Sequence, residues 1–274
     1  MRFLATKGVS VRRACLLVQL QRATFQYQAR TRPEEEALVA DITELAQQHP
    51  RYGYRRVWAL LRRKHTINRK RVHRLWKRAQ LQVKRTLRRR LRRTRPAPLA
   101  AVYPNPVWAY DFVEDHALDR STLRILTVMD EFTREGLDID VDTSSSAERV
   151  ISRLEELVAW YGAPTYLRSD NGPEFVAVAV QRWLVQRQIA TLYIDPGCPW
   201  QNGKEERFNG TVRDDCLNMH VFTSAIEASV RLSAFRHHYN EARPHSALGY
   251  QTPMEFKRAW VAAQQKSDDP NIAT

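Results

Sequence analysis

The sequence predicts an α/β domain with a mixed five-stranded sheet and flanking helices, preceded by an all-α region. The chain has 274 residues, of which 43% are hydrophobic, so it can bury one large core or two ordinary ones. Its first part is strongly basic and has the apolar spacing of helices. From about residue 105 onward, stretches typical of strands and helices follow in the order β-β-β-α-β-α-β-α, which predicts helices on both faces of a mixed sheet.

Positive charge is concentrated in one segment. Residues 51–95 hold 20 Lys or Arg and no Asp or Glu, whereas the whole chain has a net charge of +14, so the remaining residues sum to −6. Such asymmetry indicates a polyanionic partner, most often nucleic acid. The alternative is a basic tail that only adds solubility, and it is weaker because the segment also carries apolar periodicity.

Residues 33–81 predict three helices. The first begins at Pro33 with acids in its first turn, as the helix dipole favours. Residues 54–64 and 69–79 each carry apolar side chains at helical spacing, and Asn68 is a candidate N-cap between them. Two helices joined by a short turn, with arginines outside, are typical of a helix-turn-helix, which places one helix against DNA. Short basic helical hairpins also serve other roles.

Composition predicts the domain limits. We expect a helical DNA-binding region over residues 1–95, with a short helical pair at 9–30 and a basic arm that ends at 95. Prolines interrupt residues 96–106, which we expect to be a linker. The α/β domain is then expected over 107–222, and a C-terminal helical segment and tail over 223–274.

The basic arm can lie along a phosphate backbone, with counterion release supplying much of its affinity. The DNA contacts expected from the helical region and the arm are Arg55, Arg56, Arg69, Lys70, Arg71, Arg74, Lys77, Arg89 and Arg92.

Three strand-like stretches open the second half of the chain. Residues 107–115 (VWAYDFVED) alternate between apolar and polar, residues 122–132 form a continuous apolar run, and residues 137–142 (LDIDVD) alternate again. Their short connections predict an antiparallel meander.

Helices and strands then alternate. Ser145 and Glu148 have capping-box spacing at the start of an amphipathic helix. Residues 165–172 predict a short strand that ends in a turn, residues 175–188 a helix, and residues 189–197 the fifth strand.

Two aspartates stand where a site can form. Asp111 lies in the middle of an apolar strand, which is costly unless the carboxylate is paired or binds a cation. Asp170 ends its strand just before Asn171 and Gly172. It is either a turn-forming residue or a ligand at the carboxyl end of a strand, and the spacing leaves both open.

A third acid lies on the last helix of the core. Asn202 can cap this helix, and Glu205 has the spacing of its capping-box partner. An apolar stripe recurs every four residues from Phe208. At about 100° per residue, Glu206 points away from this stripe and lies almost in line with Arg213. We therefore expect Glu205 to be structural and Glu206 to face a site.

Three carboxylates from two strands and one helix, beside a DNA-binding segment, are suited to bind divalent metal ions. Their oxygens are the ligands that Mg²⁺ or Mn²⁺ prefers. Two such ions about 4 Å apart can activate an attacking oxygen and stabilise the leaving oxygen of a phosphodiester.

Several longer stretches resemble a known family. HPRYGYRRVWALL, WAYDFVED, LRSDNGPEF, QNG-x-x-ERFNGTVRDDCL and YNEARPHSALGYQTP are similar to the second reading frame (OrfB-type) transposases of the insertion-sequence-three family, over roughly residues 10–256. The spacing of Asp111, Asp170 and Glu206, with 35 residues between the last two, resembles the DDE triad of retroviral-type integrases and transposases.

The resemblance implies a ribonuclease H-like core in which Asp111, Asp170 and Glu206 are catalytic and hold two Mg²⁺ or Mn²⁺ ions. It places Arg213 near the scissile phosphate. It implies a transposase that cuts one DNA strand at each element end and joins DNA ends, acting as a homo-oligomer on double-stranded element ends and target DNA. Family members commonly act after fusion to an upstream OrfA-type product, so this chain can be the downstream part alone.

The chain departs from the family at two positions. Glu205 stands where an apolar residue is usual, and Lys204 replaces a usual aromatic residue. The spacing of 35 residues and the capping argument both favour Glu206 over Glu205 as the ligand.

One tryptophan and three histidines have less specific interpretations. Trp200 lies in a loop beside the predicted site, where it either stacks on a DNA base or has a structural role. His237, His238 and His245 lack convincing zinc spacing, so we expect surface or DNA-contact roles for them.

The three cysteines fit neither a disulfide framework nor a zinc site, and no apolar run of about 18 or more residues is present. We therefore expect a cytoplasmic protein without a membrane span, and the family resemblance implies that it is bacterial and nucleoid-associated.

Two alternative classes remain. A non-catalytic DNA-binding protein would need the basic segment but not the three acids. A plain ribonuclease H-like nuclease would need the acids but not sequence-specific binding.

Overall fold

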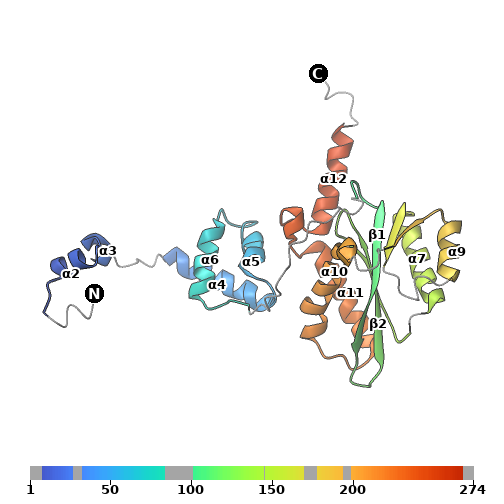
Figure 1. The fold of residues 1–274 in the computed structure, drawn as a ribbon, viewed down its shortest axis with the longest axis horizontal. Helices are drawn as coiled ribbons and strands as arrows, with labels where there is room; N and C mark the ends of the chain where they lie inside the picture. The colour runs from blue at the N-terminus through green and yellow to red at the C-terminus, as the bar shows by residue number, and fades with distance from the viewer. Residues whose placement is uncertain are drawn as a thin grey trace.

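The computed structural model describes residues 8–26, 33–83, 101–144, 146–169, 178–193 and 199–267 (Figure 1). The strands are β1 (Val107–His116), β2 (Thr122–Asp130), β3 (Gly136–Asp142), β4 (Tyr166–Ser169) and β5 (Ala190–Tyr193). The helices are α2 (Val11–Leu17), α3 (Arg22–Gln26), α4 (Pro33–Gln48), α5 (Tyr54–Leu61), α6 (Arg69–Arg78), α7 (Ala147–Tyr161), α9 (Val178–Gln186), α10 (Gly203–Asp215), α11 (Ala225–Glu241) and α12 (Pro253–Ser267). No described helix is long and apolar enough to cross a membrane.

The five strands form one mixed sheet in the order β3-β2-β1-β4-β5. β1, β2 and β3 pair antiparallel, as the short connections between them predict, whereas β4 and β5 run parallel to β1. This topology confirms the predicted fold class. It also makes β1 an inner strand, with β2 on one side and β4 on the other.

The alternation of side chains along β1 divides the core into two layers. Helices α7 and α9 cover one face of the sheet, and α10 and α11 cover the other (Figure 1). Trp108 and Tyr110 pack in the apolar cluster that contains α7 and α9, whereas Ala109 and Val113 pack in the cluster that contains α10 and α11. Helix α11, which follows residue 222, packs into the same apolar cluster as α10. The expected limit of the core at residue 222 stays a prediction.

Local spacing predicted one helix cap correctly and misplaced another by one residue. Asn68 caps α6 as predicted, because its side chain accepts a hydrogen bond from the Lys70 backbone N–H at 2.8 Å. The capping of α7 was assigned to the wrong serine. Ser146, one residue later than expected, accepts from the Arg149 N–H, while Ser145 lies outside the described residues.

The helices α4, α5 and α6 form a small unit with a core of its own. Ile42, Val57, Val72, Leu75 and Trp76 are all almost fully buried in one apolar cluster. The sequence pattern from residue 33 to 81 therefore forms the three expected helices.

This helical unit contacts the sheet domain through a joint formed by α5 and the turn before it. The Trp58 ring meets the Tyr250 ring edge-on, with centroids 5.6 Å apart. The polar contacts are Arg51 with Asp214, Arg62 with the Gly249 carbonyl oxygen, and Arg63 with Glu255, at 3.0, 3.1 and 2.8 Å. These contacts and the rings of His49, Tyr52 and His238 form the domain joint.

Three rings complete the domain joint. His49 stacks on Tyr52 and on His238, and the Tyr52 hydroxyl lies 3.0 Å from His238 Nε2. Burial lowers the pKa of His49, and burial together with the positive charge of His49 and Arg243 lowers that of His238. Asp215 opposes both shifts. Histidines with lowered pKa values favour the joint when they are neutral, so this contribution is lost as the pH falls below their ordinary pKa of about 6.5.

Acidification should therefore open the domain joint. Between about pH 8 and about pH 5, where histidine takes up its proton, we expect the radius of gyration from small-angle scattering to rise. The double variant His49→Gln/His238→Gln has no titrating ring in the joint and should show little change. An equal rise in both proteins would exclude the histidines as its cause.

A close approach between β3 and α10 gives a stability prediction. A Cβ atom on Gly136 would lie 2.8 Å from Cζ of Phe208, a ring that is 1% exposed and has no room to retreat. Gly136→Ala should therefore lower the free energy of unfolding in urea by about 1–3 kcal/mol.

Gly210 serves as the matched control, because it lies in α10 with no atom within 4 Å of the added Cβ. Gly210→Ala should be neutral or stabilise by about 0.5–1 kcal/mol. Equal stability of the Gly136 variant and the wild type would mean that Phe208 is not held against β3.

Candidate active site and nucleic-acid interface

Asp111 lies on the α10 face of β1, directly opposite Thr127 of β2. Its carboxylate is half-buried. One oxygen, Oδ2, accepts a hydrogen bond from Asn209 Nδ2 at 3.0 Å, and Oδ1 accepts from the Phe112 backbone N–H at 2.8 Å. These two bonds offset part of the cost of placing a charge on an inner strand.

Thr127 joins Asp111 to α10. Its hydroxyl oxygen is 3.1 Å from the Asp111 carbonyl oxygen, 2.8 Å from Asn209 Oδ1 and 2.8 Å from Glu205 Oε1. A hydroxyl can donate only one proton, and an amide or carbonyl oxygen can only accept. The Asp111 carbonyl oxygen, Asn209 Oδ1 and Glu205 Oε1 therefore compete for the single Thr127 proton.

Glu205 does not have the capping role that its spacing predicts. Asn202 makes no side-chain cap, and the Glu205 side chain is fully buried beneath β1 and β2. Burial raises the pKa of Glu205 well above its ordinary value, and the negative charges of Asp111 and Glu131 raise it further, against the Thr127 hydrogen bond. The capping prediction was wrong because the face of α10 that packs on the sheet includes residue 205.

Glu206 has the opposite environment. It lies in the first turn of α10 and is exposed to solvent, so its carboxylate is accessible. Arg213 is also exposed and donates from a guanidinium nitrogen to the Glu114 carbonyl oxygen at 2.9 Å.

Asp170 lies outside the described residues, two positions after Arg168 of β4. Among the residues that the structure describes, no three His, Cys, Asp or Glu side chains are grouped so as to hold a metal ion. The triad is therefore represented in the described part of the chain by Asp111 and Glu206 alone.

The donor set still suits a hard divalent cation. Asp111 is held from two sides with its carboxylate half-exposed, and Glu206 supplies an accessible carboxylate on the helix that supports Asp111. Oxygen ligands of this kind are those that Mg²⁺ and Mn²⁺ prefer.

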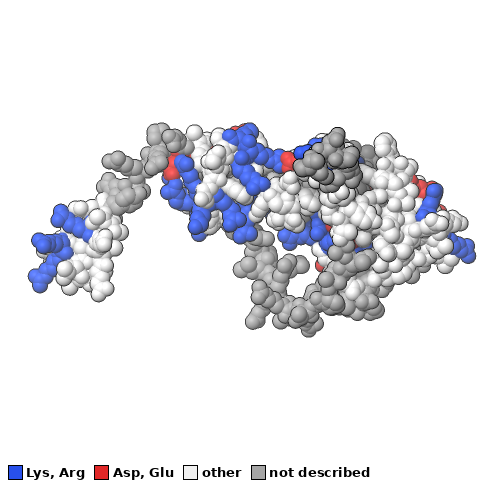
Figure 2. All heavy atoms as spheres, turned by 90° about the horizontal axis from the view of Figure 1, so that it is seen from above, with Lys and Arg blue, Asp and Glu red and all other residues white. Residues whose placement is uncertain are grey.

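The helical unit presents its cations mainly on α6. Arg69, Lys70, Arg74 and Lys77 are exposed, and Figure 2 shows Lys and Arg side chains gathered over this unit. Arg55 on α5 is exposed as well and donates to the Tyr54 hydroxyl at 3.2 Å. Helix α6 therefore has the charge and exposure of a helix that contacts a phosphate backbone.

Part of the expected set of DNA contacts has other partners. Arg71 and Arg74 approach Glu35 of α4, which Arg78 also contacts. Arg56 lies over the Tyr52 ring inside the domain joint, where burial and the charge of Arg243 lower its pKa to about 10. Arg56 is therefore better placed to hold the joint than to contact a phosphate.

The remaining expected contacts are less defined. Arg89 and Arg92 lie outside the described residues. Trp200 lies in the 3₁₀ turn Pro199–Asn202, directly before α10.

Two of the three histidines do not have the surface role that was predicted. His245 is 9% exposed, and burial lowers its pKa to about 3, so it is a neutral core residue. His238 belongs to the domain joint through Tyr52. Only His237 is exposed. Sequence spacing could not reveal the role of His238, because its partners His49 and Tyr52 come from the distant turn between α4 and α5.

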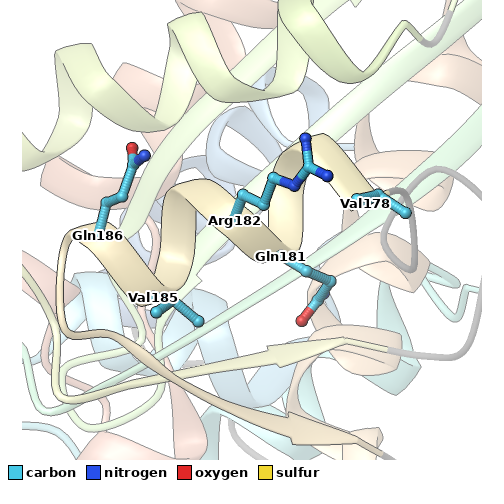
Figure 3. A pocket seen from close by; sticks show the side chains of 5 residues that line it. All are labelled: Val178, Gln181, Arg182, Val185 and Gln186. Atoms are coloured by element: carbon cyan, nitrogen blue, oxygen red, sulfur yellow. The ribbon is translucent and has the colours of Figure 1, made fainter.

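A hollow of about 450 Å³ lies on α9 and is lined by Val178, Gln181, Arg182, Val185 and Gln186 (Figure 3). All five come from one helix and none is an acid. This hollow therefore offers neither metal ligands nor a nucleophile.

Three residues at the site were missed by the sequence analysis. Thr127 and Asn209 support Asp111, and the buried Glu131 holds both Arg168 and Lys204. Asn209 had a weak signal, because it lies three residues after Glu206 and so about one helical turn away. Thr127 and Glu131 had none, since pairing across strands decides their positions.

Comparisons with known proteins agree with this arrangement. Two family models described as "Integrase core domain" match residues 101–199 and 187–253, and one described as "HTH-like domain" matches residues 33–90. The chain is 42% identical over 253 residues to the uncharacterized 31.7 kDa protein of insertion element IS407 from Burkholderia multivorans, covering 91% of each chain. It is 28% identical over 271 residues to transposase InsD for insertion element IS2 from Escherichia coli, covering 93% of this chain and 90% of the relative.

A solved structure shares the fold. The chain matches a chain of the simian T-cell lymphotropic virus intasome, solved in complex with PP2A regulatory subunit B56 gamma, with 16% identity and a TM-score of 0.51. The match covers 85% of this chain and 76% of the other.

The buried Glu205 carboxyl should make stability depend on pH. Its pKa is higher in the folded than in the unfolded chain, so the stability that it contributes is present in acid and is lost as the pH rises from about 4.5 toward the raised pKa. Glu205→Gln has no proton to lose, so its free energy of unfolding relative to the wild type should increase over this range.

Urea unfolding at several pH values, with EDTA present, measures this difference. Parallel pH profiles of the two proteins would show that Glu205 keeps an ordinary pKa.

Proposed function

Because the chain belongs to the insertion-sequence-three family of DDE transposases, we propose that Asp111, Asp170 and Glu206 are the carboxylates with which it cleaves and joins DNA. The chain is a DNA transposase, a polynucleotidyl transferase that acts on insertion-element ends. The observation that carries the assignment of its site is the half-buried Asp111 on inner strand β1, held by α10, the helix that also bears Glu206.

The choice of Glu206 over Glu205 follows from environment. Glu205 is fully buried and hydrogen-bonded to Thr127, which leaves it unable to reach a substrate without unpacking α10. Glu206 is exposed in the first turn of the same helix. The spacing of 35 residues after Asp170 supports the same choice.

The three carboxylates would hold Mg²⁺ or Mn²⁺, with two ions per site. When bound, such cations lower the pKa of an attacking hydroxyl or water and stabilise the charge on the leaving oxygen. Within the chain, Asn209 and the Phe112 N–H orient the Asp111 carboxylate, and α10 sets the position of Glu206. Arg213, two helical turns after Glu206, would contact the phosphate backbone near the cleaved bond.

Sequence-specific contact with the element end would come from the helical unit. Helix α6 has an exposed cationic face that fits the major groove, with Arg69, Lys70 and Lys77 among its outward cations. The basic arm that follows, including Arg89 and Arg92, would track the backbone. Trp200 would stack on a base beside the site.

We propose that the active form is a homo-oligomer, because two element ends must be held together for strand transfer. An upstream OrfA-type partner or fusion would add further DNA-binding capacity. An enzyme with this substrate would work on the bacterial nucleoid.

A non-catalytic DNA-binding protein is the competing interpretation. Such a protein needs the cations of α6 but gains nothing from a carboxylate on an inner strand, which costs free energy to bury. The support given to Asp111 by Thr127 and Asn209 therefore favours the enzyme.

Cleavage and joining of a labelled oligonucleotide with the element's terminal sequence tests the assignment, with Mg²⁺ or Mn²⁺ present. Asp111→Asn and Glu206→Gln should each lose more than about 100-fold in rate, beyond the usual effect of a residue that only supports a metal ligand. Glu205→Gln should stay active, and all variants should bind DNA like the wild type.

The opposite result, with activity lost in Glu205→Gln and kept in Glu206→Gln, would transfer the ligand role to Glu205. An inactive wild type that binds the element end would support the binding protein, if addition of the upstream partner does not restore activity.

A further inference from the structure

Glu131 is a buried carboxylate to which two cations from different parts of the chain are bound. It directly follows β2, it is 2% exposed, and its backbone N–H donates to the Val107 carbonyl oxygen at 3.0 Å. One oxygen, Oε1, accepts from Arg168 Nε at 2.6 Å, and the other, Oε2, accepts from Lys204 Nζ at 2.8 Å. Both oxygens of the carboxylate are therefore engaged with separate segments.

Each of these cations comes shortly before a proposed metal ligand. Arg168 lies on β4, two residues before Asp170, and pairs across the sheet with Ala109 of β1, itself two residues before Asp111. Lys204 lies in the first turn of α10, two residues before Glu206. Glu131 thus connects the strand that leads to Asp170 with the helix that bears Glu206.

We propose that Glu131, Arg168 and Lys204 form a clamp that fixes the end of β4 relative to the start of α10, the two segments that lead to proposed metal ligands. All three are positioning residues, since none of them is a proposed ligand. The inference rests on the proposed function, because it needs Asp170 and Glu206 to act as ligands together.

The clamp would act by restricting the relative positions of the two segments, not by adding stability. A buried ion pair adds little net stability, because desolvation offsets its attraction, but it tolerates few alternative arrangements. Arg168 is 4% exposed, so its guanidinium cannot leave Glu131 for water. Metal ligands are held in place by the groups behind them, and loss of such groups typically weakens metal binding by about 10–100-fold.

The chain offers a matched control for Lys204. Lys257 of α12 contacts Glu135 at 2.7 Å, and these side chains are 30% and 5% exposed. Lys204 contacts Glu131 at 2.8 Å, and these side chains are 27% and 2% exposed. The two pairs are nearly equal in length and in burial. Lys257, however, does not precede a proposed ligand.

Mn²⁺ binding to the full-length protein, measured by isothermal titration calorimetry, tests the clamp. Lys204→Met should weaken binding by about 10-fold or more, whereas Lys204→Arg should stay near the wild-type affinity because it keeps the charge. Lys257→Met should bind Mn²⁺ like the wild type. Thermal unfolding should show similar losses of stability in the two methionine variants.

The outcomes separate the clamp from the proposed site. Equal Mn²⁺ affinity in Lys204→Met and the wild type, with binding abolished by Asp111→Asn, would overturn the clamp and leave the site intact. Equal weakening in Lys204→Met and Lys257→Met would also overturn it, because the effect would then be general loss of stability. Binding that is unaffected by Asp111→Asn would instead contradict the proposed function itself.

Discussion

A carboxylate on an inner strand is the constraint on which the rest of this structure depends. Asp111 lies between neighbouring strands and beneath α10, where an uncompensated charge would be costly. Part of its compensation comes from Asn209, which donates to the carboxylate and is itself bound by Thr127 opposite Asp111, and these contacts restrict the rotation of α10 about its axis. The same rotation buries Glu205 and exposes Glu206, so one requirement determines which of two adjacent glutamates is accessible.

The apolar packing follows the same arrangement. Phe208 and Val212 face the sheet one and two turns along α10, and the absence of a side chain on Gly136 lets the Phe208 ring approach β3. The stability of the core and the geometry of the site are therefore set by the same helix. A change that shifts α10 to relieve crowding would also move Glu206.

Residues 238–250 connect the helical unit to the sheet domain. His245 is buried, Tyr250 contacts Trp58 of α5, and His238 completes the ring stack with His49. The sequence block around residues 239–253 resembles a family block but gave no mechanism when considered alone. In the structure this block contacts the helical unit, through Tyr250 with Trp58 and through the Gly249 carbonyl oxygen with Arg62, and so joins that unit to the sheet domain.

Local patterns predicted the strands, their succession along the chain, the cap at Asn68 and the position of Asp111, because alternation and helix periodicity depend on near neighbours. They failed at Glu205, where the capping-box spacing was present but packing against β2 decided the role of the side chain. They could not reveal the clamp, since Glu131 is 37 residues from Arg168 and 73 from Lys204. The fold was thus largely predictable, whereas the groups that support the site depend on contacts between distant segments.

Anomalous diffraction from crystals of the protein soaked with Mn²⁺ would test the central claim most directly, since it locates the metal without reference to activity. We expect an anomalous peak within coordination distance of Asp111, Asp170 and Glu206, about 2.0–2.6 Å from their oxygens as for hard divalent ions, with Glu205 still bound to Thr127. A peak on Glu205, or a metal site that excludes Asp111, would contradict it.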